Sequence, residues 1–267
     1  GGRMRRGSSP GPGAGGGGAF RGGPDQPGLV VAVLGASGGA GASTLAVACG
    51  LALADRGLRV VLVDGQPGGS GLDVVLGVEH LPGVRWPDLL DCEGVDGSAL
   101  LAGLPWALGV AVLSHGRELR PAPGWSVLAD AVAGLRAVAD VVVLDLPRAG
   151  ADRVGTLGAD IAFVVAGTGV VELAGLAATA PRVAAHVGET FLVLRADRSG
   201  GSASAVALEV GAALDLPVLA LVGEDRGVRH DLDRGRPPGR RPGPVARAVE
   251  RMAQTVEEFA SVRRRAS

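Results

Sequence analysis

The chain has 267 residues, of which 47% are apolar and only 3% aromatic, and 26 basic against 27 acidic residues give a net charge of −1. This length suits one α/β domain with a little additional chain. The near-neutral charge argues against a protein that covers nucleic-acid phosphates with a broad basic surface. Its two cysteines exclude a disulfide scaffold and fit a reducing cytosol.

All 26 basic residues are arginine, and the sequence contains no lysine, asparagine or tyrosine. The missing residues have A/T-rich codons, so the composition indicates a GC-rich genome. Under that bias an ancestral lysine would usually become arginine. A position where related proteins have lysine and this chain has neither basic residue is therefore informative.

The first 28 residues are mostly Gly, Pro, Ser and Arg, with Phe20 nearly alone as a large apolar side chain. They cannot bury enough apolar surface to offset the entropy of ordering, so residues 1–28 are predicted to form a disordered tail or linker. No apolar segment typical of a secretory signal occurs in this stretch. The chain begins with Gly, so an upstream domain of a longer protein is one expectation.

From residue 29 the chain alternates between short, continuous apolar runs and Ala/Leu-rich segments. Continuous runs are typical of parallel strands buried on both faces, and the expected strands are 29–34, 59–63, 108–113, 141–144, 161–166, 191–194 and 218–222. The expected helices are 43–56, 122–138, 170–187, 202–214 and 244–260. This alternation predicts a three-layer α/β domain over residues 29–262, with a mostly parallel sheet and helices on both faces. Residues 263–267 would be an Arg-rich tail.

A glycine-rich loop, residues 35–44 with the sequence GASGGAGAST, connects the first strand to the first helix. Such a loop presents several backbone N–H groups to one anion, and the helix dipole reinforces them. A merely flexible turn is the alternative in so glycine-rich a protein. A dinucleotide fingerprint is weaker, because the glycines do not fall as G-x-G-x-x-G. The strand–loop–helix context favours phosphate binding.

The loop resembles the deviant Walker A motif of the MinD/ParA family, K-G-G-x-G-K-[ST]-[ST]. Ser37 falls on the family's signature lysine and Ala42 on its Walker lysine, and neither position has become arginine. The other motif positions are kept: Gly38, Gly39, Gly41, Ser43 and Thr44. The resemblance implies a P-loop fold whose phosphate loop has lost both of its cations.

Further segments extend the resemblance over most of residues 29–260. In the switch segment after the second strand, Asp64 and Asp73 are kept, and Gln66 replaces the acid that helps to position the attacking water. Asp145 lies at the end of a strand that resembles Walker B. Its Asp-Leu-Pro-Arg ending is similar to the CpaE/TadZ branch, which includes actinobacterial septum site-determining (Ssd-like) proteins. Arg195 stands where the family has an asparagine that reads adenine.

The site that this resemblance implies is a degenerate ATP site. Its cofactor-binding residues would be Gly38, Gly39, Ala40, Gly41, Ala42, Ser43, Thr44 and Arg195. Ser43 and Asp145 would hold Mg²⁺, and Asp64 and Asp145 would be the catalytic acids. Without the lysines, ATP and Mg²⁺ are expected to bind weakly or not at all, and ATPase activity to be very weak or absent.

A compensating cation is a further hypothesis, because the loop itself contains none. Arg148, just past the Walker B acid, is the first candidate to restore charge near the phosphates, and Arg195 is the second. The alternative for Arg148 is an ion pair at the surface or with a partner.

The resemblance implies a cytoplasmic spatial regulator of the CpaE/TadZ type, which positions a Flp/Tad pilus or secretion apparatus or the division septum. It would act as a homodimer with pilus, secretion or division proteins and be recruited to the membrane periphery or the cell pole. The alternatives are an active MinD-type ATPase that cycles on a membrane or partner, and a ParA-like DNA-partitioning factor. Nucleic-acid binding is not expected, since the Arg-rich loop 234–243 has no interleaved aromatic residues and is better interpreted as a mobile, solvated loop.

The last helix places five apolar side chains along one face and ends in arginines at 263–265. The apolar positions are Val245, Val249, Met252, Val256 and Phe259. This pattern fits a membrane-surface helix, as MinD proteins carry, or the last core helix of the domain. The few aromatic residues on the face, and the arginines gathered at its end, favour the core helix.

Overall fold

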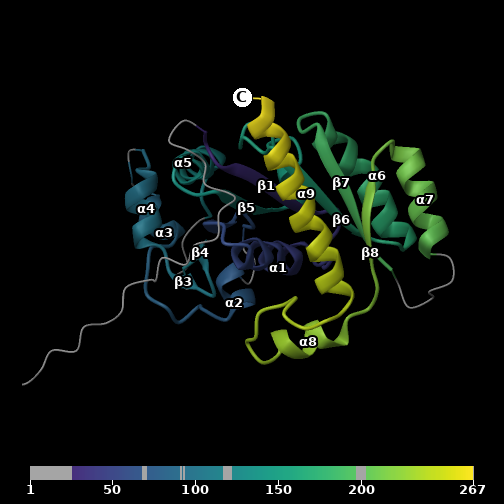
Figure 1. Ribbon diagram of the computed structural model, residues 1–267, viewed down its shortest axis with the longest axis horizontal. Helices are drawn as coiled ribbons and strands as arrows, with labels where there is room; N and C mark the ends of the chain where they lie inside the picture. Colours follow the sequence, from purple (N-terminus) through teal and green to yellow (C-terminus); the bar gives the residue numbers. More distant parts are fainter. Residues whose placement is uncertain are drawn as a thin grey trace, which may run out of the picture.

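The computed structural model describes residues 26–67, 71–90, 92, 94–116, 122–196 and 203–266. It centres on an eight-stranded sheet in the order β3-β4-β2-β5-β1-β6-β7-β8 (Figure 1). The strands are β1 (Leu29–Gly35), β2 (Val60–Asp64), β3 (Trp106–Ala107), β4 (Val110–Leu113), β5 (Val141–Leu146), β6 (Ile161–Gly167), β7 (Glu189–Arg195) and β8 (Val218–Val222). Every neighbouring pair is parallel except β3 and β4, which form an antiparallel edge.

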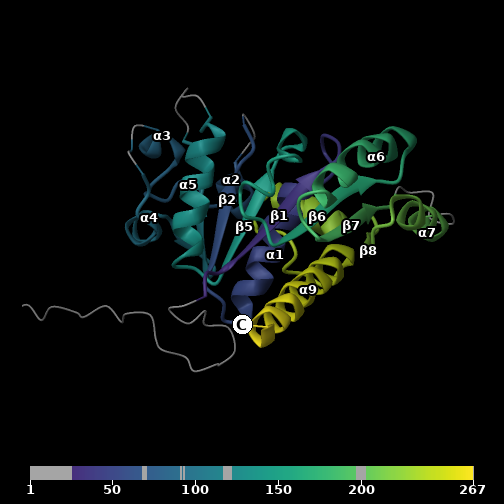
Figure 2. The same ribbon diagram turned by 90° about the horizontal axis from the view of Figure 1, so that it is seen from above.

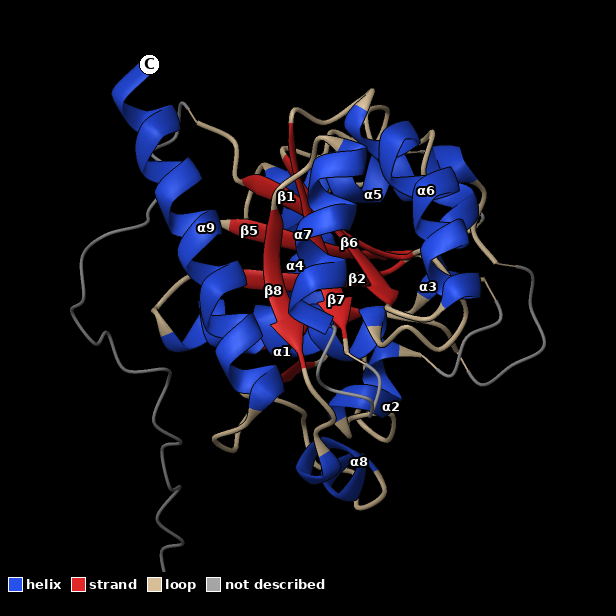
Figure 3. Cartoon of the chain, turned by 90° about the vertical axis from the view of Figure 1, so that its right-hand side faces the viewer, coloured by secondary structure: helices blue, strands red, loops and turns tan. Residues whose placement is uncertain are grey.

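Helices cover both faces of this sheet (Figure 2). On one face lie α1 (Ala42–Asp55) and α9 (Pro244–Ala266), and on the other α5 (Trp125–Arg136), α6 (Val170–Ala184) and α7 (Ala203–Leu214). The shorter helices are α2 (Leu72–Leu76), α3 (Trp86–Leu89), α4 (Gly97–Gly103) and α8 (Arg226–Leu232), with a 3₁₀ turn at Arg148–Gly150. In Figure 3, α8 lies beyond the carboxyl end of β8.

The central strands are buried on both faces, which explains their continuous apolar sequences. In β1, Val31 and Val33 pack into the core beneath α1 and α9, whereas Val30 and Ala32 pack into the core beneath α5 and α6. Successive side chains of a strand point to opposite faces, so a strand between two helical layers needs apolar residues at every position. The predicted three-layer, mostly parallel α/β architecture is confirmed.

The C-terminal helix α9 is a core helix of the domain. Its predicted apolar face is buried at Val245, Val249, Met252 and Val256, and it packs along α1 and β8. The helix continues through the arginines at 263–265, which the sequence had placed in a separate tail, and Arg263 Nη1 lies 3.3 Å from Asp160 Oδ1. None of the helices in the described ranges combines the length and apolar composition that a bilayer crossing requires.

Two further expectations need correction. Gly28, placed in the disordered tail, is buried, and its N–H donates to the Arg136 carbonyl at 2.8 Å; residues 1–25 of that tail lie outside the described residues. The Arg-rich loop is held by carboxylates and is not simply solvated. Arg241 Nη2 lies 3.1 Å from Asp231 Oδ1, and Arg240 pairs with Asp55 of α1.

Several short elements were not predicted, namely β3, α2, α3, α4 and α8. Each has two to seven residues, which is too short for a helical or strand period to stand out in sequence. Two tryptophans lie between β2 and β4: Trp86 is fully buried and Trp106 is 45% exposed.

Shortening a buried side chain of α9 should distinguish a packed core helix from a detachable membrane anchor. Met252→Ala is expected to lower the free energy of unfolding by about 2–5 kcal/mol, because it leaves a cavity between α9 and α1. Val262→Ala, on the same helix but 56% exposed, should change it by no more than about 0.5 kcal/mol. Urea unfolding measures both, and equal small effects would contradict the packed helix.

Candidate nucleotide site

The glycine-rich loop joins β1 to α1 at the carboxyl edge of the sheet. Gly39 and Gly41 have φ angles of 72° and 92°, a left-handed conformation that glycine adopts without strain. A Cβ added at Gly38, Gly39 or Gly41 would meet no atom within 4 Å, so the loop backbone faces open space. The first N–H groups of α1 lack intrahelical acceptors, and the residues that carry them, Ala42, Ser43 and Thr44, line this space. The loop therefore keeps the backbone geometry of an anion site.

A cavity of about 850 Å³ lies against this loop. It is lined by the whole of residues 35–44 and by Asp64, Gln66, Asp145, Arg148 and Arg195. A second cavity, of about 930 Å³, lies between the ends of β6, β7 and β8 and helix α8. Ala40, Gly41, Thr44, Arg195 and Leu232 line both, so the two cavities adjoin.

All the residues predicted for cofactor, metal and catalytic roles line the loop cavity. They are Gly38, Gly39, Ala40, Gly41, Ala42, Ser43, Thr44, Asp64, Asp145 and Arg195. They come from the loop after β1, the first turn of α1, and the strands β2, β5 and β7. The carboxyl ends of these parallel strands meet at one edge of the sheet. The topology thus brings together residues that lie far apart in the sequence.

Asp145 is the most perturbed acid of the site. It is fully buried and pairs in register with Asp64 across β5 and β2. Burial raises the pKa of Asp145 to about 7; the neighbouring Asp64 charge adds to the rise, while the Ser43 hydroxyl and the Gln66 amide oppose it. Among the described residues no basic side chain offsets this rise in pKa, in keeping with a loop that contains no lysine or arginine.

Two buried polar atoms of the cavity lack a hydrogen-bond partner among the described residues. One is Asp145 Oδ2, whose companion Oδ1 accepts from Gln66 Nε2 at 3.3 Å, and the other is Ser37 Oγ. Orphaned buried oxygens call for a ligand, ion or water. Mg²⁺ accepts carboxylate and serine hydroxyl ligands. Asp145, with its unpartnered Oδ2, and Ser43, whose hydroxyl hydrogen-bonds to Asp145, fit the metal of a nucleotide complex.

Asp64 is bound by several donors at the start of the switch segment. Its Oδ2 accepts from Leu72 N at 2.9 Å and lies 2.9 Å from Ser114 Oγ, and its Oδ1 accepts from Gln66 N at 3.1 Å. The Trp86 indole donates to the Asp64 carbonyl at 2.7 Å. Asp64 therefore holds the backbone at two points of the switch segment, Gln66 and Leu72.

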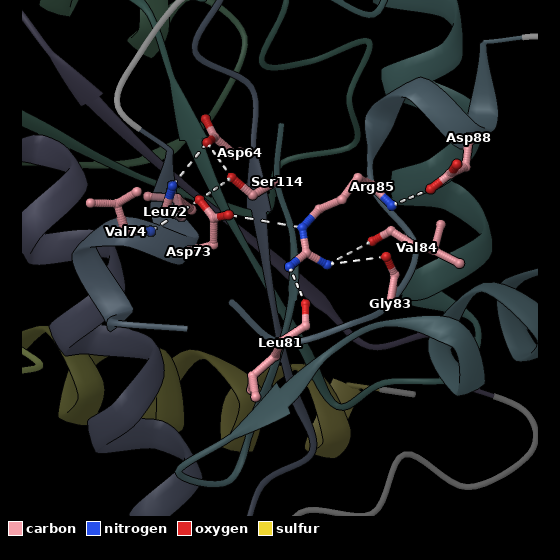
Figure 4. Close-up of polar contacts among 10 residues, drawn as sticks. All are labelled: Asp64, Leu72, Asp73, Val74, Leu81, Gly83, Val84, Arg85, Asp88 and Ser114. Atoms are coloured by element: carbon pink, nitrogen blue, oxygen red, sulfur yellow. Dashed lines mark hydrogen bonds and ion pairs between the residues drawn. The ribbon is translucent and has the colours of Figure 1, made fainter. Parts of the chain in front are cut away.

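A buried polar network continues from Asp64 to the segment before α3 (Figure 4). Ser114 Oγ also lies 3.2 Å from Asp73 Oδ1, and Arg85 Nε lies 3.8 Å from Asp73 Oδ2. The Arg85 guanidinium also donates to the carbonyls of Leu81, Gly83 and Val84. Within the connection between β2 and β4, the network links the switch segment to residues 81–85.

Sequence reasoning missed Ser114, Trp86 and Gly175 at this site. Ser114 directly follows β4, so its place at the carboxyl end of a parallel strand was the available signal. Gly175 allows α6 to approach the loop, since a Cβ there would lie 2.8 Å from the Ala36 carbonyl oxygen. No sequence pattern marks that contact.

Fold and loop together define a P-loop nucleotide-binding domain. The CobQ/CobB/MinD/ParA nucleotide binding domain family matches residues 31–261. The chain belongs to this family. The match covers the loop, both buried acids and all eight strands apart from the start of β1.

Known proteins resemble the chain in sequence and in fold. An uncharacterized protein of Mycobacterium tuberculosis strain H37Rv, Rv3660c, is 37% identical over 231 residues, which are 84% of this chain and 63% of that protein. The chain thus spans less than two thirds of this relative's length. The fold is similar to that of Pyrococcus horikoshii MinD, a septum site-determining protein complexed with Mg-ADP, at 20% identity and a TM-score of 0.69 over 88% of this chain and 98% of that one.

A complex of MinC and MinD from Aquifex aeolicus gives a similar match. Its TM-score is 0.69 at 19% identity, covering 85% of this chain and 95% of that one. Identities this low support the fold alone.

Replacing the perturbed acid should change how stability depends on pH. The pKa of Asp145 is raised from 3.8 to about 7, so the native state keeps a proton that the unfolded chain releases between these values. Stability is therefore lost as pH rises from about 4 to about 7. Asp145→Asn, which cannot ionise, should gain about 2–4 kcal/mol over the parent at pH 8, relative to their difference at pH 4. Denaturant unfolding at both pH values tests this, with Asp130→Asn, exposed on α5, as the control; a gain independent of pH would contradict it.

Removing the shared hydroxyl should weaken the buried network. Ser114→Ala removes the hydroxyl that lies within hydrogen-bond distance of both Asp64 and Asp73, and the free energy of unfolding is expected to fall by about 1–3 kcal/mol. Ser126→Ala, exposed on α5, should be nearly neutral. Thermal unfolding of the two variants compares them, and equal midpoints would show that the hydroxyl does not stabilise this region.

Proposed function

We propose that this protein is a CpaE/TadZ-like, septum site-determining (Ssd-like) regulator of the MinD/ParA family. It positions a pilus or secretion apparatus or the division septum by binding protein partners, as a homodimer with little or no nucleotide turnover. One observation carries the proposal. The phosphate loop keeps its open backbone beside the buried Asp145, whose Oδ2 has no hydrogen-bond partner among the described residues, while residues 36–45 contain no cation.

The missing lysines weaken nucleotide binding without abolishing it. A lysine about 4 Å from a phosphate oxygen contributes roughly 4 kcal/mol at an effective dielectric constant near 20. Desolvation reduces this figure, and losing even half of it weakens binding by about tenfold or more. The N-terminus of α1 still supplies roughly half a positive charge. A Mg²⁺ ion held by Ser43 and Asp145 would neutralise part of the phosphate charge.

Turnover suffers more than binding. Phosphoryl transfer depends almost wholly on positioning and on stabilising charge in the transition state. Gln66 replaces a carboxylate of the family pattern, and its amide donates to Asp145 at 3.3 Å. These features favour a regulator over the active ATPase that is the main alternative.

Exposed apolar side chains beside the loop support a role in protein contacts. Val170 and Val171 begin α6 and are 86% and 79% exposed, and Val171 also lines the loop cavity. Such residues are suited to a dimer or partner surface next to the nucleotide. The Aquifex MinC:MinD complex is an example of a similar fold that assembles with a protein. The burial of the α9 apolar face favours recruitment through proteins over direct membrane insertion.

Restoring the lysine tests whether the loop remains a phosphate site. Ala42→Lys is expected to bind MgATP about tenfold or more tightly than the parent in calorimetric titrations, because it returns a cation to the start of α1. Ala102→Lys, exposed on α4, adds the same charge away from the cavity and should leave affinity unchanged. An Ala42→Lys variant that folds but gains no affinity would contradict the retained phosphate site.

Hydrolysis and DNA retention distinguish the alternatives. Rapid Mg²⁺-dependent ATP cleavage by the purified parent would favour the active ATPase and contradict the proposed regulator. Salt-sensitive retention on DNA would favour a partitioning factor. A stable dimer with neither property is the result that we expect.

A further inference from the structure

The cation that balances a bound phosphate chain must come from outside the loop. Residues 36–45 have no basic side chain, and the same cavity is lined by two carboxylates, Asp64 and Asp145. Among the described residues, two arginines line this cavity, Arg148 and Arg195. Arg226 and Arg229 line only the adjoining cavity beside α8.

Arg195 is held against the loop. It is the last residue of β7, and its Nη1 donates to the Gly39 carbonyl at 2.9 Å. Its backbone is fixed between neighbouring strands, in register with Gly167 on β6 and Val222 on β8. Within the described part of the chain no carboxylate pairs with it. A guanidinium has five N–H donors, so donors remain after the bond to Gly39.

Arg148 has no comparable anchor. It is exposed at the first position of the 3₁₀ turn after β5, and no hydrogen bond or ion pair of its side chain occurs among the described residues. Its Nη1 lies 4.0 Å from the point where a Cβ on Gly175 would stand. An arginine that must be ordered on binding loses more side-chain entropy than one already positioned.

We propose that Arg195 is the phosphate-contacting cation of this site, supplied from β7 and positioned by the Gly39 carbonyl at the junction of the two cavities. This inference rests on the proposed function, because it requires a nucleotide in the loop cavity. It differs from the sequence-based expectation in two ways. It prefers Arg195 to Arg148 as the compensating charge, and it gives the residue at the adenine-reading position a contact with the phosphates instead of the base.

Two probes separate a phosphate contact from a base contact. Calorimetric titrations would use inorganic tripolyphosphate and adenosine, each with the parent and with Arg195→Ala. We expect Arg195→Ala to weaken tripolyphosphate and MgATP binding by about tenfold or more and to leave adenosine binding unchanged. Arg195→Gln keeps a donor for Gly39 without the charge and should lose as much affinity. Arg153→Ala, exposed and away from both cavities, is the matched arginine control.

The other possible results of these titrations have the following consequences. Loss of adenosine binding with unchanged tripolyphosphate binding would make Arg195 a base contact. Unchanged MgATP binding in both variants would overturn this inference and leave the proposed function standing. A parent that binds neither MgATP nor tripolyphosphate would overturn this inference together with the retained phosphate site on which it rests. Should Arg195→Ala unfold, as circular dichroism would reveal, Arg195→Gln and Arg195→Lys decide the question, with Arg195→Lys expected to retain most of the affinity.

Discussion

Two buried carboxylates at the carboxyl edge of the sheet set the electrostatics of this protein. The register of β2 and β5 places Asp64 beside Asp145, so the fold itself forces the two acids together. Asp64 is stabilised by the N–H groups of Gln66 and Leu72 and by the Ser114 hydroxyl, whereas Asp145 keeps an oxygen without a partner in the described chain. The raised pKa of Asp145 reflects burial beside a like charge, with no compensating cation in the described part of the chain.

Anion binding by the loop depends on backbone groups, whereas catalysis depends on side chains. The loop binds anions through backbone N–H groups, which persist whatever residues occupy positions 37 and 42. Catalysis instead requires charges at fixed points, and those are side-chain properties. A family member can therefore lack the lysines and still keep its fold and pocket. Arg195 fits this view because it adds charge from another strand without altering the loop.

The connection between β2 and β4 is part of the site's support. Trp86 donates to the Asp64 carbonyl, and Arg85 approaches Asp73 while donating to three backbone carbonyls of its own segment. A conformational change in the switch segment would therefore shift α3, and a shift of α3 would alter the switch segment. Buried polar networks of this kind are costly to break one member at a time, which makes the arrangement rigid.

The sequence by itself determined the layered α/β fold, the position of the phosphate loop and the absence of lysine from that loop. These features are local: a strand buried on both faces needs a continuous apolar run, and a phosphate loop needs glycines between a strand and a helix. It also placed the last helix in the core, from the composition of its apolar face.

Only the tertiary structure decided which distant residues meet. Ser114 reaches Asp64 because β4 lies beside β2. Trp86 reaches it because the connection from β2 to β4 folds back to the end of β2. Arg195, the last residue of β7, reaches the Gly39 carbonyl of the loop, and Arg263 near the end of α9 lies beside Asp160. Contacts across a parallel sheet join residues that are far apart in the chain, so no local pattern records them.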